Sequence, residues 1–196
     1  MNFGIYIYKN AEVLDFSGPF EVLSTANRLG NKDWNIFLVS ENQGVTQARG
    51  GYPINSHFSF EDHPEIDVLI VVGGIHTEEV KKSNVTTWVA KVAENSMKVA
   101  SVCTGAFILA EAGLLDGLTV TTHWEDLSDL MTDYPQLNVV SDQRWVPQGK
   151  YITSGGISAG IDMTLHLVSE LANLTLAKET AKQMEYNWQK NTQPSV

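Results

Sequence analysis

The sequence predicts an α/β fold over residues 1–196, a single domain with a mostly parallel sheet and helices on both faces. Strand patterns alternate with helix patterns along the chain, which is the order that βαβ units produce. The run at 68–72 is almost purely apolar, as expected for a strand that a parallel sheet buries on both faces. The 196 residues are 43% hydrophobic and 18% charged, which suits one domain with a sizeable core.

The expected elements follow from periodicity and from the residues that end each pattern. Strands are expected at 3–8, 34–40, 68–72, 99–103 and 118–122, with further strand signals near 137–140, 143–147 and 151–153. A first helix should carry Pro19 in its first turn and stop at Gly30. Later helices are expected over 77–95, 104–113, 123–131, 158–171 and 175–188. Residues 42–56, rich in Gly, Asn and Gln, indicate turns with a short hairpin.

Composition excludes several classes of function. Thirteen basic and 23 acidic side chains give a net charge of −10, which repels phosphate backbones, so no nucleic-acid partner is expected. The single cysteine cannot form an intrachain disulfide or a CxxC metal site, and the five histidines lack metal-ligand spacing, so no metal is expected. Residues 1–8 lack signal-peptide features, and no apolar stretch approaches the roughly 20 residues that span a bilayer. We therefore expect a cytoplasmic protein without a membrane partner.

Candidate functional residues follow the predicted strands. Ligands of open α/β sheets bind beyond the carboxyl ends of the strands. That position singles out Asp15, Gly73-Gly74, Cys103-Thr104-Gly105 and His123. No Gly-x-Gly-x-x-Gly pattern and no phosphate-loop lysine motif is present, so no dinucleotide cofactor is expected.

Cys103 joins an apolar strand directly to an Ala-rich helix. A nucleophile on such a sharp turn projects into the crevice, and the nearby helix N-terminus favours the thiolate over the thiol. The alternative is a buried structural cysteine, which is the usual role of an isolated Cys.

The other candidates also have two interpretations each. Asp15 has apolar neighbours that would raise its pKa and suit it to proton transfer, but it could instead cap a helix. The backbone amides of Gly73, Gly74 and Thr104 could form an oxyanion hole, or the glycines could make an ordinary turn. His123 could act as a base for Cys103, or simply pack at a helix start.

Several motifs, taken in order, resemble those of the ThiJ/PfpI superfamily over about residues 3 to 188. They are Asp15 to Leu23, Gly73-Gly74, Val102 to Ala106, Ala112 to Gly117, Thr121 to Trp124 and Ser154 to Asp162. The resemblance implies a three-layer sandwich with a flavodoxin-like, mostly parallel sheet, as in class I glutamine amidotransferases. Asp15, Cys-Thr-Gly and Thr-Thr-His-Trp are most similar to the isonitrile hydratase branch. Thr104 stands where protease-like members have His, which disfavours peptidase chemistry, and Asp15 in place of Glu weakens the inference of glyoxalase or deglycase activity.

The resemblance implies a function without a cofactor. Cys103 would attack a small-molecule isonitrile, Asp15 would move the proton, the Gly74 and Thr104 amides would hold the reacting group, and the Thr104 hydroxyl could tune the thiolate. A thiol-based redox or carbonyl-stress sensor, a ligand-binding domain, and a glyoxalase or deglycase activity are the alternatives. The resemblance also implies a homodimer, for which Phe20, Leu23 and the Trp124 region are candidate contacts.

Overall fold

The computed structural model describes residues 1–191 and contains a seven-stranded central sheet with strand order β10-β11-β7-β6-β1-β2-β5. Every neighbouring pair in it is parallel except β10 and β11. The strands are β1 (Asn2–Tyr6), β2 (Asn35–Ser40), β5 (Phe58–Ser59), β6 (Val68–Val71), β7 (Lys98–Val102), β10 (Trp145–Gln148) and β11 (Tyr151–Ser154). Two small pairs lie outside this sheet: the hairpin of β3 (Val45–Gln47) and β4 (Pro53–Asn55), and the parallel pair of β8 (Thr119–Val120) and β9 (Asn138–Val139).

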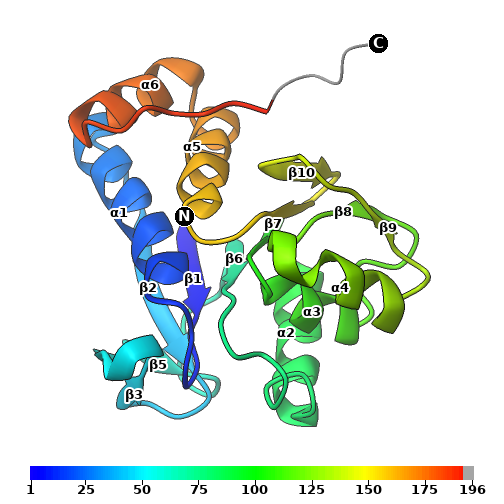
Figure 1. Cartoon of the computed structure of the whole chain (residues 1–196). Helices are drawn as coiled ribbons and strands as arrows, with labels where there is room; N and C mark the ends of the chain where they lie inside the picture. Colours follow the sequence, from blue (N-terminus) through cyan, green and yellow to red (C-terminus); the bar gives the residue numbers. More distant parts are fainter. Residues whose placement is uncertain (192–196) are drawn as a thin grey trace.

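Helices cover both faces of the sheet (Figure 1). They are α1 (Val13–Gly30), α2 (Ser83–Asn95), α3 (Gly105–Glu111), α4 (Leu127–Asp133), α5 (Ala159–Leu171) and α6 (Leu174–Gln183), with short 3-10 helices η1 (Arg49–Gly51) and η2 (Trp124–Asp126). The chain moves from β1 to β2 in one direction across the sheet and from β6 to β7 in the other. Because such crossovers are right-handed, α1 and α2 lie on opposite faces. Accordingly α1, α5 and α6 contact one another, and α2 contacts α3.

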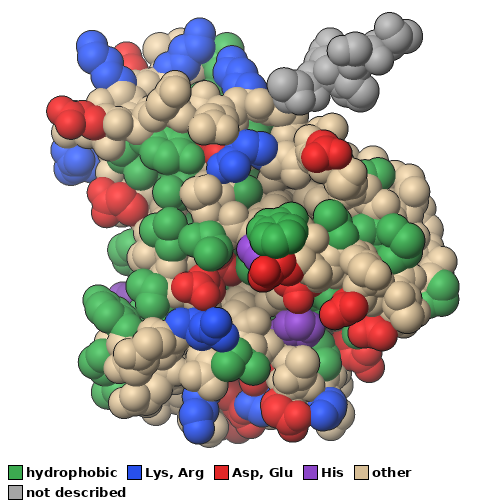
Figure 2. All heavy atoms as spheres, in the orientation of Figure 1, with side chains coloured by type: hydrophobic (Ala, Val, Ile, Leu, Met, Phe, Trp, Pro, Cys, Tyr) green, Lys and Arg blue, Asp and Glu red, His purple; other side chains and the backbone are tan. Residues whose placement is uncertain are grey.

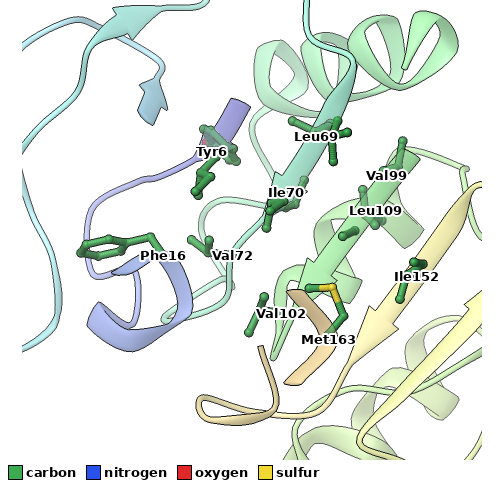
Figure 3. Close-up of a cluster of buried hydrophobic side chains, with 14 of the residues drawn as sticks. Tyr6, Phe16, Leu69, Ile70, Val72, Val99, Val102, Leu109, Ile152 and Met163 are labelled. Carbon is green, nitrogen blue, oxygen red and sulfur yellow. The ribbon is translucent and has the colours of Figure 1, made fainter. Parts of the chain in front are cut away.

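The core is built from strand residues that are buried on both faces of the sheet. All four residues of β6 are fully buried, as its apolar sequence predicts. Figure 3 shows side chains from the central strands meeting those of the flanking helices, with Leu109 of α3 and Met163 of α5 among them. This packing fixes the carboxyl ends of β1, β6 and β7, from which the candidate site residues extend.

The predicted α/β class and the mostly parallel sheet are confirmed, as is the hairpin within 42–56. The placement of Pro19 in a first helical turn is wrong, because α1 begins six residues earlier, at Val13. Helix α2 begins at Ser83, not at 77, because the segment before it forms turns that carry Glu79 inward to the Tyr6 hydroxyl. Strand β5 has only two residues and gave no sequence signal.

Two further differences concern the C-terminal part and the surface. Helix α6 ends at Gln183, and the segment after it bonds instead to Asp162 through the Trp188 indole and the Gln189 amide. Leu23 is fully buried in the core and therefore cannot form the intersubunit contact predicted for it. Within residues 1–191, no helix combines the length and apolar character needed to cross a lipid bilayer.

Candidate functional site

The strand order places a crevice at the centre of the sheet. The direction of the crossovers reverses between β1 and β6, and ligands of open α/β sheets bind at such a point. Asp15 follows β1, the Gly73-Gly74 pair follows β6, and Cys103 follows β7. Three segments far apart in the sequence thus meet at one edge of the sheet, as the sequence predicted.

Cys103 lies on a strained turn between β7 and α3. Its φ is 54°, in the left-handed region that few residues other than glycine adopt. The surroundings hold it there: its amide donates to the Gly155 carbonyl at 3.2 Å, and its own carbonyl accepts from the Thr122 hydroxyl at 2.8 Å. Two residues later, Gly105 is required, because a Cβ there would lie 2.2 Å from the Val71 carbonyl oxygen. This geometry is that of a nucleophile elbow.

Asp15 lies in the first turn of α1 with its side chain fully buried. Its Oδ2 accepts from the Gly73 amide at 3.0 Å, whereas Oδ1 is buried without a hydrogen-bond partner of normal geometry. Burial raises the pKa of Asp15 to about 7, although hydrogen bonds from the Gly73 amide and the Cys103 side chain oppose the rise. The carboxyl group is therefore close to half-protonated at neutral pH and sits beside the Cys103 sulfur.

The predicted stabilisation of the Cys103 thiolate is wrong for the protein without a ligand. Burial raises the pKa of Cys103 well above its ordinary value, and the charge of Asp15 adds to the rise. The Thr104 amide, at the start of α3, lowers the pKa but does not compensate. The helix is only seven residues long, and Cys103 is buried, so desolvation exceeds the effect of the helix terminus.

The predicted oxyanion hole is also changed, because two of its amides are already engaged. The Gly73 amide donates to Asp15, and the Gly74 amide donates to Thr104 Oγ1 at 2.9 Å. The Thr104 hydroxyl in turn donates to the Gly74 carbonyl at 3.0 Å. Gly73 is nevertheless essential to the shape of the site, since a Cβ there would lie 2.6 Å from the Thr104 nitrogen. The Thr104 amide is the predicted donor that remains directed at the sulfur.

A pocket of about 400 Å³ opens above Cys103. Its lining includes the predicted residues Gly74, Cys103, Thr104 and His123. Asp15 is not among the lining residues, so it reaches the pocket only through its contact with Cys103.

His123 lies beside acidic side chains at the edge of this pocket. Its Nδ1 is 3.3 Å from Asp126 Oδ2 and 3.9 Å from Glu125 Oε2. Its ring packs against the backbone of Gly156, where a Cβ would come within 2.0 Å of His123 Cδ2. These contacts orient the imidazole toward its acidic neighbours, and whether it acts on Cys103 stays a prediction.

Sequence reasoning did not assign His76, Glu12 and Arg49 to the site, yet all three line the pocket. The His76 ring packs against Phe107 at a tilt of 36°, with ring centroids 4.2 Å apart, and burial lowers the pKa of His76. The Nε atom of Arg49 lies 3.7 Å from Oε2 of Glu12. His76 comes two residues after the predicted Gly73-Gly74 pair, and this position was its available signal. Arg49 begins the short 3-10 helix η1, in a segment whose sequence has no periodicity and gave no signal.

The mouth of the pocket is mixed in character. Glu12, Glu125 and Asp126 outnumber the single cation, Arg49, and Ile75 and Ile157 add apolar surface. Figure 2 shows acidic, histidine and hydrophobic side chains close together near the middle of the face that it presents. Among residues 1–191, no group of three or more His, Cys, Asp or Glu side chains is arranged to hold a metal ion.

The chain is similar to proteins with several different activities. It is 32% identical over 188 residues to an isonitrile hydratase of Pseudomonas putida, covering 95% of this chain and 78% of that protein. It is 31% identical over 182 residues to the HTH-type transcriptional regulator CdhR of Pseudomonas aeruginosa, covering 93% of this chain and 54% of the regulator, so it spans about half that protein's length. A deglycase of Pyrococcus abyssi is 31% identical over 132 residues, which cover 64% of this chain and 80% of the deglycase.

Solved structures share the fold. A ThiJ/PfpI family protein from Pseudomonas syringae has a TM-score of 0.86 at 24% identity, covering all of this chain and 78% of that one. DJ-1beta of Drosophila melanogaster has a TM-score of 0.82 at 20% identity, covering 95% of this chain and 98% of that one. Residues 4–170 match the sequence model of the DJ-1/PfpI family. The motifs, the elbow and these matches agree, and the chain belongs to the DJ-1/PfpI (ThiJ/PfpI) family.

Proposed function

We propose that this protein is a cysteine-dependent enzyme that adds water to an isonitrile, R–N≡C, and releases an N-substituted formamide. The observation that carries the proposal is the strained turn that presents Cys103 to a pocket of small-molecule size, with the buried carboxyl group of Asp15 held close by on the Gly73 amide. The similarity to an isonitrile hydratase over 95% of the chain supports the choice of substrate class.

In the first step, the Cys103 sulfur forms a bond to the terminal carbon of the isonitrile. The thiol proton passes through Asp15 to the same carbon, which gives a thioimidate, R–N=CH–S–Cys. The sulfur and the hydrogen have then both added to one carbon atom, and no oxidant or reductant is needed. A carboxyl group with a pKa of about 7 can both accept and donate a proton near neutral pH, which is the property this step requires.

In the second step, water attacks the thioimidate carbon. Asp15 takes a proton from the water, the nitrogen gains a proton, and the C–S bond breaks to release R–NH–CHO and the Cys103 thiol. The Thr104 amide, directed at the sulfur, stabilises charge on it as it leaves. The net reaction consumes one isonitrile and one water, so the site returns to its starting state.

The pocket supports a substrate without negative charge. Glu12, Glu125 and Asp126 surround the mouth, and their charges disfavour anions there. Ile75 and Ile157 offer apolar contacts to an alkyl or aryl R group.

The test is a turnover assay with neutral alkyl and aryl isonitriles, comparing the wild type with Cys103→Ala and Asp15→Asn. Both variants should lose at least about 100-fold in rate, the usual size of a lost nucleophile or proton carrier. Asp162→Asn is the matched control, because Asp162 is also a buried aspartate in the first turn of a helix but does not line the pocket. Formamide production by Cys103→Ala at the native rate would refute the proposal.

The same assay includes 2-oxoaldehydes and their adducts with amines, since a deglycase is among the relatives. Turnover of these compounds through Cys103, with no turnover of isonitriles, would assign the site to carbonyl chemistry instead.

A further inference from the structure

Glu79 is a buried carboxylate that the proposed reaction does not use. It lies in the irregular segment before α2 and is 4% exposed, and it is the only buried residue between positions 75 and 82. Its Oε1 accepts a hydrogen bond from the Tyr6 hydroxyl of β1, and its Oε2 lies 3.0 Å from the Lys82 ammonium group. A buried ion pair adds little net stability compared with apolar residues of similar size, so stability alone does not explain a charge at this place.

The segment that Glu79 anchors forms part of the wall of the candidate pocket. Three consecutive residues of this segment line the pocket: Ile75, His76 and Thr77. The main chain of Glu79 is tied directly to this wall, because the His76 carbonyl accepts from the Glu79 amide at 2.8 Å and from the Val80 amide at 3.0 Å. One tight turn therefore joins the buried carboxylate to the residues that face the pocket.

No regular secondary structure holds this part of the wall. Residues 75–82 belong to neither a helix nor a strand. The segment is held at its start by the Ile75 amide, which donates to the Asn10 carbonyl at 3.2 Å. Its one buried side chain, that of Glu79, is bonded to Tyr6 in the central sheet. The position of the wall relative to the sheet therefore depends on where Glu79 is bonded.

We propose that Glu79 is a positioning residue for the substrate: its bond to Tyr6 fixes the turn that presents Ile75 and His76 to the R group of the isonitrile. A carboxylate suits this task because a hydrogen bond has a preferred distance and direction, whereas an apolar side chain can settle in several positions. The part of this inference that concerns the R group rests on the proposed function. The placement of the wall does not, and the two parts are tested separately.

The main test variant combines Tyr6→Phe with Glu79→Leu. Replacing both partners by apolar groups leaves neither of them buried and unpaired, so the protein should stay folded while the directional link is lost. Lys82 keeps a partner in this variant, because its ammonium group also lies 3.1 Å from Glu41 Oε2. Urea unfolding of the variant checks that it remains folded.

The first readout is the titration of His76, followed by NMR and assigned with the variant His76→Gln. Burial lowers the pKa of His76, and the charges of Asp126, Asp133 and Asp129, which no test variant changes, oppose this effect. A loosened wall exposes the imidazole, so the pKa of His76 should rise by about half a unit in the double variant. Loss of the Glu79 charge alone would lower it, so the sign of the change separates the two effects.

The second readout is the turnover of a bulky alkyl isonitrile. KM should rise by about threefold to tenfold while kcat changes by less than about twofold, because the wall contacts the R group and not the reacting atoms. Iodoacetamide should alkylate Cys103, the chain's only cysteine, at the wild-type rate, since the Thr122 hydroxyl and the Gly155 carbonyl still hold the elbow. If the wild type turned over no isonitrile, the proposed function would fail, and the titration of His76 would still decide whether Glu79 holds the wall.

Glu79→Gln and Glu78→Leu are the matched controls. Gln keeps an acceptor for the Tyr6 hydroxyl, so Glu79→Gln should neither raise the pKa of His76 nor raise KM. Glu78 is the neighbouring residue and also pairs with a lysine three positions later, at 2.7 Å, but both side chains of that pair are exposed. Glu78→Leu should therefore change neither readout.

Three results would overturn the proposal. One is a folded double variant in which either the titration of His76 or the value of KM matches the wild type. The others are a Glu79→Gln protein that behaves like the double variant, and a Glu78→Leu protein with an equal shift. If the double variant does not fold, Tyr6→Phe alone decides by the same criteria, because it removes the bond to Tyr6 and keeps the contact of Glu79 with Lys82.

Discussion

Replacing Asp15 by Asn should make the protein more stable at alkaline pH, although the same change removes the proton carrier. The folded protein keeps the proton on Asp15 up to pH of about 7, whereas the unfolded chain releases it near the ordinary pKa of 3.8. Unfolding therefore releases a proton between these two pH values. The stabilising effect of the protonated group is full below pH of about 4 and is lost as the pH rises through about 7.

The size of this change in stability follows from the difference of about three units between the folded and unfolded pKa values of Asp15. At 1.36 kcal/mol per unit, the ionised carboxylate costs about 4 kcal/mol of unfolding free energy at pH 8. Asn stays neutral and can still accept from the Gly73 amide. Its new NH₂ group replaces the unpartnered Oδ1 and costs about 1 kcal/mol, which leaves a net gain of about 3 kcal/mol.

The assay is urea unfolding of the wild type and of Asp15→Asn at pH 4.5 and at pH 8. The free energy of unfolding of the variant should exceed that of the wild type at pH 8, and this difference should disappear at pH 4.5. Asp62→Asn is the control with the opposite sign, because hydrogen bonds from Ser59 lower the pKa of the exposed Asp62 carboxylate. The reasoning would be refuted if Asp15→Asn were no more stable than the wild type at pH 8. It would also be refuted if the variant and the wild type differed in unfolding free energy by the same amount at both pH values.

Three other predictions follow from packing and exposure. Gly105→Ala should lower the unfolding free energy in urea by about 1–3 kcal/mol, because its Cβ would collide with the Val71 carbonyl; an unchanged midpoint would contradict this. Thr122→Val should cost about 1 kcal/mol in the same assay and slow the alkylation of Cys103, because it removes the hydrogen bond that holds the Cys103 carbonyl. We also propose a homodimer that uses Trp124, which is 73% exposed; sedimentation should give twice 21.6 kDa for the wild type and a lower mass for Trp124→Glu.

Much of the fold could be predicted because burial leaves a direct trace in the sequence. The run at 68–72 predicts a strand covered on both faces, and β6 is that strand. The strand–helix alternation predicts crossovers, and these bring Asp15, Gly73 and Cys103 to one edge of the sheet. Irregular segments could not be predicted, because they have no periodic pattern; the turns that bury Glu79 before α2 are an example.

The chemistry of the candidate site was harder to predict than its location. The expected thiolate rested on the short helix after Cys103, yet the balance between a helix terminus and desolvation depends on burial, which the sequence does not give. The engagement of the Gly74 amide depends on where the Thr104 hydroxyl points, which is a matter of one side-chain rotamer. Arg49 reaches the pocket from the short 3-10 helix η1, and no local sequence pattern indicates a proximity between segments so far apart in the chain.

Pro19 has a consequence for how the first turn of α1 moves. A residue at this place would normally donate its amide to the carbonyl four residues earlier, which belongs to Asp15, but proline has no N–H. The first turn of α1, which carries the Asp15 carboxyl group, is therefore held to the rest of the helix by one main-chain hydrogen bond fewer. Amide hydrogen exchange should accordingly find this turn opening independently of the later turns, so that the acid can adjust its distance to the sulfur while the helix stays folded.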